Sequence, residues 1–328
     1  SFALLSYASS WLKCHEPACF LAALLNSLPM GFYSASQLVQ DARRHGVRVL
    51  PIDVTVSDID CTLEGNPEPL RPARGLGAPP LPQPAVRLGL RMVSSLHADA
   101  AKRLLQARAT GPAFASTEDL ALRAQLSQQD LQALAAADAL ASLSGHRRQQ
   151  MWDAVAQHAA PPLWRDVPVH EAPLQLPEAP EGEEILFDYA ATGLTLRRHP
   201  LALLRPRLAR WRLQTALQLH SVAHGRKVRA CGIVTVRQRP GTAKGTMFVT
   251  LEDETGPVNV IVWPAMVDVW RNALLRSQLL AVEGVWQCSP GALGSKAMVR
   301  HLVAQRFKDL TPLLGRIGRA LQGSRDFH

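Results

Sequence analysis

The sequence predicts an α+β multidomain protein that is helical in its first two thirds and contains a small β-barrel in its last third. Three observations predict this fold class. Apolar residues recur at helical spacing over most of the first 200 positions. From Arg226 onward the spacing changes to alternation, which is typical of half-buried strands. Two Pro-rich stretches, residues 64–85 and 160–185, interrupt the helical part and indicate domain boundaries.

Residues 1–63 are expected to form a first, mostly helical region. The opening residues place Leu4, Tyr7 and Trp11 on one helical face. A second helix is expected to carry Pro17 in its first turn, and a third to be capped by Ser34. The run "VRVLPIDV" then reads as a short buried strand.

The stretch at residues 64–85 is rich in Pro and Gly and lacks any period, so we interpret it as a flexible loop or insertion. Alanine-rich helices follow over residues 86–159. A Pro-rich linker at 160–185 closes that block, and residues 186–224 indicate a mostly helical connector.

A tight turn at Ser94–His97 separates two of these helices and is similar to the turn of a helix-hairpin-helix element. Such a turn offers backbone N–H groups and a helix N-terminus to a DNA phosphate. Glycine normally permits the close approach, but Ser95 and His97 occupy the two positions here. Lys102, one turn later, is a source of charge. The alternative is a packed helical hairpin without a ligand.

A second candidate hairpin leads from Ser144 and Gly145 into a helix that begins with His146, Arg147 and Arg148. Arginine at a helix N-terminus opposes the helix dipole unless an anion lies there, at a cost of a few tenths of a kcal/mol. This mismatch favours a DNA contact through Gly145, Arg147 and Arg148 over a merely solvated charge run.

Residues 225–308 predict an OB-fold, because three strands, a short helix and two strands follow one another in about 85 positions. OB-folds bind single strands with the second and third strands and the loop after the first. That loop and its flanks carry Arg237, Arg239 and Lys244, and the two strands carry Phe248 and Trp263. Each aromatic side chain either stacks on a base or belongs to the core. Residues 309–328 form a basic tail.

Two acidic clusters resemble metal sites but are interpreted as structural. Glu252, Asp253 and Glu254 fall at the bend between two strands, so we expect a solvated hairpin tip with diverging carboxylates. Asp58 and Asp60 are two apart at the end of a short segment, and no third carboxylate is placed to join them. No catalytic or metal-binding residue is therefore predicted.

The net charge of +9 is unevenly distributed. Residues 201–328 contain 19 Lys and Arg against 7 Asp and Glu, which favours a polyanionic partner such as nucleic acid. No run of about 18 apolar residues is present, so no membrane span is expected. The N-terminus does not read as a signal peptide, and the five cysteines are scattered and odd in number. These features indicate a cytoplasmic protein.

Several long stretches together resemble the alpha subunit of bacterial DNA polymerase III. The first 54 residues are similar to the last part of its fingers domain. "PMGFYSASQLVQDARRHGV", "ATGLTLRRHPLALLR" and the ending "SRDFH" are most similar to the error-prone branch of the family. The resemblance covers nearly the whole chain in order: fingers end, helix-hairpin-helix block, OB-fold and short tail.

The resemblance implies a DNA-directed DNA polymerase that acts in damage-induced mutagenesis and translesion synthesis. It also implies that the palm, with its metal-binding aspartates and Mg²⁺, lies outside this chain, so these residues alone should not polymerise. The expected partners are duplex product, single-stranded template and mutasome proteins, through which the sliding clamp is reached. The alternatives are a replicative fragment that binds the clamp through Glu183 to Tyr189 and a non-catalytic single-strand-binding accessory protein.

Overall fold

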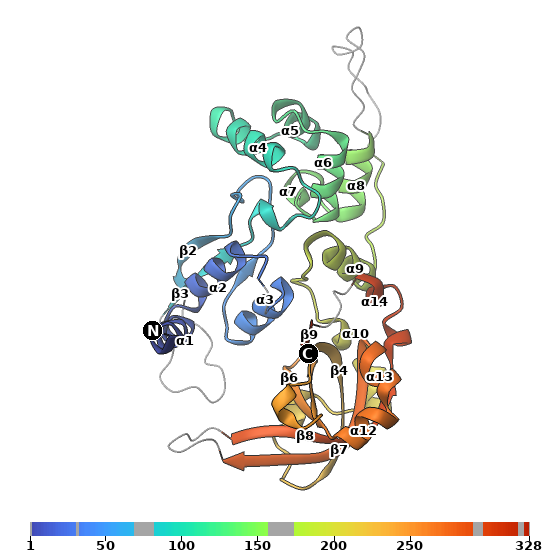
Figure 1. Cartoon of the computed structure of the whole chain (residues 1–328). Coiled ribbons are helices and arrows are strands. Elements are labelled where there is room, and N and C mark those ends of the chain that lie inside the picture. The colour runs from blue at the N-terminus through green and yellow to red at the C-terminus, as the bar shows by residue number, and fades with distance from the viewer. Residues whose placement is uncertain are drawn as a thin grey trace. The chain divides into compact units, whose positions relative to one another are not determined.

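The computed structural model describes residues 2–30, 33–68, 82–156, 174–290, 298–320 and 325–327. The chain divides into two compact units, Ser1–Leu196 and Arg197–His328 (Figure 1). Each unit contains its own hydrophobic core. The boundary between them falls within residues 186–224, which were expected to form one connector.

The first unit opens with three helices, α1 (Phe2–His15), α2 (Pro17–Asn26) and α3 (Ala35–Arg44). Two sequence signals for their ends are confirmed. Pro17 is the first residue of α2, where its missing N–H costs no hydrogen bond. Ser34 and Gln37 form a capping box at the start of α3, which satisfies two otherwise unpaired N–H groups.

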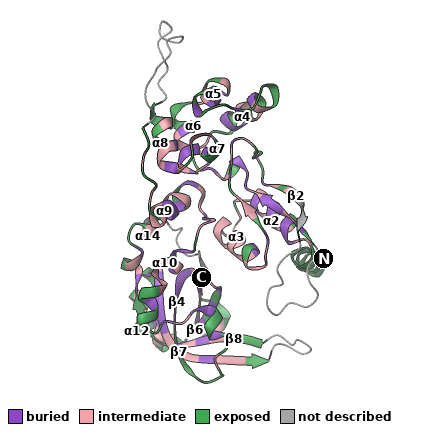
Figure 2. Cartoon of the chain, turned by 180° about the vertical axis from the view of Figure 1, so that it is seen from behind, coloured by how far each residue is buried: buried purple, intermediate pink, exposed green. Residues whose placement is uncertain are grey.

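Helix α1 contains no buried residue, and it appears almost wholly exposed near the N-terminal label (Figure 2). The predicted apolar face is present, but Leu4 is 67% exposed, Tyr7 69% and Trp11 45%. By contrast, α2 buries Leu21 and Leu25 fully in the core of this unit.

A three-stranded sheet follows, with β3 (Gln83–Arg87) between β1 (Val49–Leu50) and β2 (Thr62–Glu68). β1 runs parallel to β3, and β2 runs antiparallel to it. The prediction of a loop over residues 64–85 is therefore wrong at both ends, because backbone pairing between β2 and β3 orders residues that lack any apolar period. The middle of that stretch, 69–81, lies outside the described residues.

The rest of the first unit is a helical block that packs around Leu104, Leu120, Leu131 and Leu140. Of the predicted linker, 160–173 lies outside the described residues, as do 157–159 of the helical block. The structure places the block's elements as follows: η1 (Leu90–Met92), α4 (Ala98–Thr110), α5 (Thr117–Arg123), α6 (Gln128–Ala136), α7 (Ala141–Ser144), α8 (Arg147–Ala156) and α9 (Glu181–Thr192).

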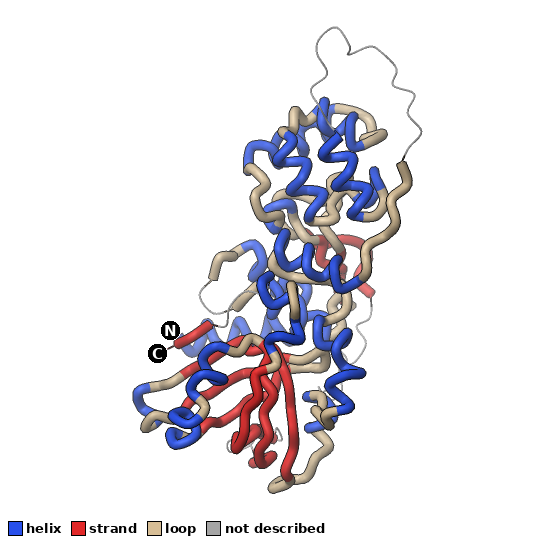
Figure 3. Tube along the Cα trace, turned by 90° about the vertical axis from the view of Figure 1, so that its right-hand side faces the viewer, coloured by secondary structure: helices blue, strands red, loops and turns tan. Residues whose placement is uncertain are grey.

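The second unit contains the predicted barrel, which confirms the OB-fold and the α+β class (Figure 3). Hydrogen-bonded strands follow the order β5-β6-β8-β7-β4, and β5 also pairs with β4, which closes the barrel. Its strands are β4 (Lys227–Gln238), β5 (Met247–Glu252), β6 (Pro257–Val262), β7 (Leu279–Pro290) and β8 (Met298–Asp309).

Alternating apolar residues fill the barrel, as the two-residue period requires. Val249, Leu251, Val260 and Val282 are each 1% exposed. Helices α12 (Pro264–Val269) and α13 (Arg271–Arg276) connect β6 to β7. The order of three strands, a helical connection and two strands is the one expected from the sequence.

Further elements flank the barrel on both sides in the sequence. Before it come α10 (Pro200–Arg210) and α11 (Ala216–Leu219), and η3 (Gly241–Ala243) lies in the β4–β5 loop. After it come η4 (Thr311–Leu314), α14 (Ile317–Ala320) and β9 (Arg325–Phe327), which pairs in parallel with β4. No helix in the described part of the chain is long and apolar enough to cross a bilayer.

Candidate nucleic-acid interface

The first candidate hairpin turn lies between η1 and α4, and its backbone has the conformation that glycine favours. Ser95 adopts φ 65° and is exposed. This left-handed conformation costs a non-glycine residue about 1–2 kcal/mol. The N–H of the preceding Ser94 donates to the carbonyl of Ala191 at 2.7 Å, which helps to hold the turn in place.

The two basic residues predicted at this turn both have acidic partners. His97, 62% exposed, lies with its Nδ1 2.8 Å from Oδ1 of Asp130. Burial raises the pKa of Asp130, but hydrogen bonds from Ser127 and His97 outweigh it and leave the pKa below its ordinary value. Lys102 pairs with Asp99 at 3.1 Å on the surface, where both side chains are mostly exposed. An incoming phosphate would have to compete with these carboxylates.

The second candidate turn, at Gly145, has an open backbone. Gly145 adopts φ 72° and ψ −132°, which only glycine adopts without strain. A Cβ placed there would meet no atom within 4 Å, so another chain can approach the main chain closely. Helix α8 begins two residues later at Arg147, and its first amides point toward the turn.

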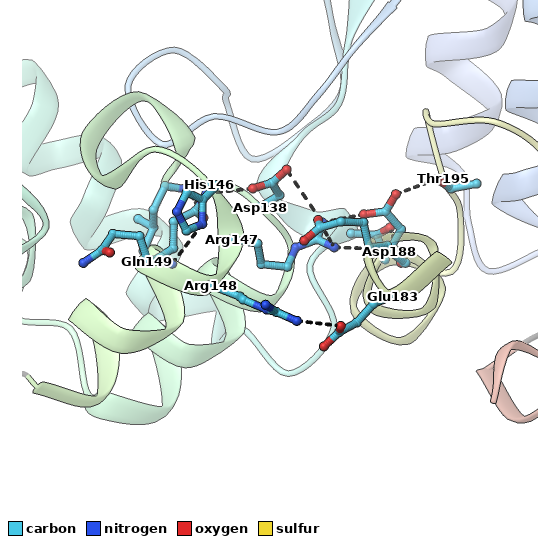
Figure 4. Close-up of polar contacts among 12 residues, drawn as sticks. Asp138, His146, Arg147, Arg148, Gln149, Glu183, Asp188 and Thr195 are labelled. Carbon is cyan, nitrogen blue, oxygen red and sulfur yellow. Dashed lines mark hydrogen bonds and ion pairs between the residues drawn. The ribbon is translucent and has the colours of Figure 1, made fainter. Parts of the chain in front are cut away.

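The side chain of Arg147 does not face solvent, which corrects the prediction that it contacts DNA. It is 2% exposed, and its guanidinium lies 2.5 Å from Asp188 and 3.0 Å from Glu184 (Figure 4). Asp138 is 3.8 Å away. The cation is therefore desolvated and neutralised by carboxylates from α9 and from the turn before α7, and its role here is to bind α8 to α9.

Arg148 lies nearer the surface beside this cluster. Its Nη2 is 2.8 Å from Oε2 of Glu183, and both side chains are just over one third exposed (Figure 4). Arg148 and Arg147 together thus pair with all the acidic residues of the segment Glu183 to Tyr189. Ile185 and Tyr189 of the same segment are 0% and 7% exposed.

On the barrel, Arg237 is buried against the end of α13, which again corrects an expected DNA contact. It is 6% exposed, and its guanidinium donates to the carbonyls of Leu274 and Ser277 at 2.5 Å each. These are carbonyls that the last turn of a helix leaves unpaired. Arg237 thus caps the helix rather than facing the β4–β5 loop.

Arg239 and Lys244 both lie exposed in the β4–β5 loop, as expected. Lys244 adopts φ 48°, so the chain bends at this position. Neither side chain has a carboxylate partner within the described part of the chain.

Two aromatic side chains stay at the surface beside this loop. Phe248 on β5 is 37% exposed and lies opposite Ile261 on β6. Trp263 follows β6 directly and is 52% exposed. Because side chains two apart on a strand share a face, Ile261 and Trp263 lie on the same side as Phe248. The barrel thus presents two aromatic groups next to two exposed cations.

The acidic turn after β5 is not the solvated hairpin tip that the sequence suggested. Asp253 is 2% exposed and accepts hydrogen bonds from the N–H groups of Ala216, Thr255 and Gly256. Glu254 pairs with Arg205 of α10 through both oxygens, at 2.5 and 2.7 Å. The turn is buried because its carboxylates satisfy backbone and guanidinium donors of α10 and α11, which sequence proximity could not reveal.

Asp58 and Asp60 have local partners. Asp58 accepts from the N–H of Ile59 at 2.7 Å, and Asp60 pairs with Arg91 at 2.8 Å. Across the described ranges, no three His, Cys, Asp or Glu side chains gather as a metal site would need.

Sequence reasoning missed a further set of surface cations on the barrel, around β7, β8 and the end of α10. The signals were Arg306 and Lys308, two apart on one strand, and the cations on either side of Trp211. The sequence alone does not group these cations, because they come from separate segments that only the folded barrel brings together.

Two family models match the chain. One is described as a helix-hairpin-helix motif and matches residues 46–150. The other is described as an OB-fold nucleic acid binding domain and matches residues 228–310. The first range includes the turns at Ser95 and Gly145, and the second includes the exposed aromatic residues of the barrel.

Curated relatives match along the whole chain. The error-prone DNA polymerase of Ralstonia nicotianae is 54% identical over 333 residues, which cover 100% of this chain and 29% of that protein. The error-prone DNA polymerase of Methylococcus capsulatus is 52% identical over 336 residues, covering 100% of this chain and 31% of that protein. The chain thus spans about three tenths of the length of these relatives.

Similarity to solved structures is weak. The mitochondrial single-stranded DNA binding protein Rim1 of S. cerevisiae aligns with a TM-score of 0.22 and 16% identity, over 26% of this chain and 94% of that chain. A score of this size supports no argument about function.

Proposed function

We propose that this chain is a segment of an error-prone DNA polymerase and that the segment binds DNA for that polymerase. In this proposal the barrel holds single-stranded template and the helix-hairpin-helix block holds the backbone of duplex product. The two family models and the whole-chain similarity support the assignment.

The activity proposed for the whole protein is DNA-directed DNA synthesis in damage-induced mutagenesis and translesion synthesis. Nucleotide transfer with Mg²⁺ would take place at palm aspartates, a domain that the resemblance implies outside these residues. Mutasome proteins, and the sliding clamp through them, are the proposed protein partners. These elements rest on the 52–54% identity to error-prone DNA polymerases and on the resemblance in sequence.

One observation carries the DNA-binding proposal: exposed aromatic rings lie beside exposed, unpaired cations on the barrel. Phe248 and Trp263 offer flat apolar faces, and bases stack on such faces whatever their sequence. Arg239 and Lys244 supply the charge that attracts the phosphate backbone.

The hairpin block contributes through its main chain in this proposal. The open backbone at Gly145 and the first amides of α8 suit a phosphate oxygen, which accepts from N–H groups at a helix N-terminus. The turn at Ser95 offers a similar but more crowded backbone. Contacts of this kind position a duplex without reading its sequence.

The replicative alternative receives less support. It requires the segment Glu183 to Tyr189 to be free for a clamp, whereas Ile185 and Tyr189 are buried and Glu183 pairs with Arg148. The accessory-protein alternative does not explain homology to polymerases along the whole chain.

Fluorescence anisotropy of the purified chain with a labelled single strand tests the proposal. Each single-strand phosphate that is neutralised contributes about −0.7 to the slope of log K against log salt. Three contacts predict that affinity falls about 20-fold between roughly 50 and 200 mM salt. An affinity that stays constant over this range, or no binding at low salt, would refute the proposal.

A further inference from the structure

A cationic groove lies on the wall of the barrel that faces away from Phe248 and Trp263. Its cavity of about 560 Å³ lies over β7 and β8 and is bordered by the end of α10 and by Trp270, between α12 and α13. In the closed strand order, β7 pairs with β4 and β8 but not with β5 or β6. The groove is therefore separate from the aromatic surface described above.

Positive charge dominates this groove. Arg210, Arg212, Arg306 and Lys308 line it and are all exposed. None of the four has a carboxylate partner within the described part of the chain. Cations this close repel one another, so their arrangement favours an anionic ligand.

The single acidic side chain in the groove is already paired. Glu283 on β7 lies between Arg229 on β4 and Arg306 on β8 in the strand register. Its Oε2 is 2.8 Å from Nε of Arg229, so this carboxylate does not neutralise Arg306 directly. A row of three charged residues across the sheet thus retains an excess of positive charge.

An aromatic platform stands at the edge of the groove. Trp211 is 38% exposed, and Arg207 and Lys308 lie 5.5 and 5.3 Å from its ring centroid. A nucleobase that stacks on the indole would displace the flexible end of Lys308. The ammonium group would then be free to pair with the phosphate of the same nucleotide.

A second cavity adjoins the groove and extends its cationic lining. This cavity of about 590 Å³ shares Arg212, Arg229 and Glu283 with the first and adds Lys227. The two cavities thus meet at the Arg229–Glu283 pair, and each is lined by further cations.

We propose that this groove is a second binding site for single-stranded DNA, with one base on Trp211 and the adjoining phosphates on Arg210, Arg212 and Arg306. The proposal rests on the proposed DNA-binding function and extends it to the opposite wall of the barrel. Alternating cations and an aromatic ring match a nucleotide strand, which carries one charge and one flat base per repeat.

The test measures binding of the whole chain to a single strand of about 30 nucleotides, longer than the roughly 4–16 that one OB-fold face holds. Trp211→Ala should weaken binding about 5- to 150-fold, as the loss of one stacked base does. The double variant Arg306→Ala, Lys308→Ala should also weaken it. The matched control Arg271→Ala, Arg276→Ala removes the same charge from α13, outside the groove, and should change affinity less than about twofold.

Crosslinking gives an independent readout. A strand with photoreactive 5-iodouracil should attach to the peptide that contains Trp211 as well as to the Phe248–Trp263 wall. Two outcomes would contradict the groove as a DNA site while leaving the proposed DNA-binding function intact. One is attachment to the Phe248–Trp263 wall alone, and the other is groove variants that bind DNA as tightly as their control. Absence of any DNA binding would overturn both. If Trp211→Ala unfolds the barrel, the Arg306 and Lys308 variant decides the question.

Discussion

The helical block and the barrel treat their positive charges in opposite ways. In the block, the basic side chains predicted to meet DNA have acidic partners: His97 pairs with Asp130, Lys102 with Asp99, and Arg148 with Glu183. On the barrel, Arg239 and Lys244 have no carboxylate partner among the described residues.

This difference indicates that a basic residue favours a polyanion partner only where no acidic residue of the same chain neutralises its charge. In the block, the proposed contacts are made by the main chain at the two turns and at the start of α8, so side-chain changes there should affect stability more than binding. On the barrel, the proposed contacts are exposed side chains, so changes there should affect binding more than stability.

The largest effect is expected from Arg147→Ala. Removing the guanidinium takes a desolvated cation away from Glu184 and Asp188, and breaking a buried ion pair from one side typically costs about 3–5 kcal/mol of unfolding free energy. Urea unfolding should show this loss, whereas Arg148→Ala, which breaks a half-exposed pair, should cost less than about 1 kcal/mol. A stable Arg147→Ala protein with weakened DNA binding would reverse our assignment.

Next comes Trp263→Ala on the barrel. Loss of a stacking platform should lower single-strand affinity by about 1–3 kcal/mol, or roughly 5- to 150-fold, with little change in stability because the ring is 52% exposed. Trp152→Ala is the matched control, since Trp152 is 51% exposed on α8. Equal losses in the two variants would show that the barrel surface is not special.

Acid should weaken the block through Asp130. Its carboxyl pKa is lowered in the folded state, because hydrogen bonds from Ser127 and His97 outweigh the opposing effect of burial. The stability it contributes is therefore present above its unfolded pKa of about 4 and is lost as the pH falls through the folded value.

Asp130→Asn removes that charge and should cost about 1–2 kcal/mol at pH 7. Its unfolding free energy should also vary less with pH below about 4 than that of the parent chain. A variant with the same acid dependence as the parent would place the titrating group elsewhere.

Local signals predicted the barrel well, because each strand and turn is encoded in its own residues. The alternating run at 227–238 is β4 from end to end, and Pro264 opens the helical connection. The cap at Ser34 was equally readable, because its partner Gln37 is three residues away.

The burial and the pairing partners of the charged residues could not be predicted from local signals. Arg147 meets Asp188 41 residues later, and Arg237 meets Ser277 40 residues later. Both arginines look like surface cations in the sequence, since burial depends on long-range packing. The same holds for Asp253, which caps the backbone of Ala216 from 37 residues away.

The smallest effect is expected at Ser95, where a substitution tests whether the main chain of the turn contacts DNA. Ser95→Gly relieves a left-handed conformation that costs about 1–2 kcal/mol, but glycine also loses more backbone entropy on folding, by about 0.5–1 kcal/mol. We expect a net gain of about 0.5–1 kcal/mol in unfolding free energy. Duplex binding should stay equal or rise, because a turn without Cβ lets phosphate approach the N–H groups. Ser95→Ala keeps the strain and removes only the hydroxyl, so weaker duplex binding in both variants would assign the contact to that hydroxyl and not to the main chain.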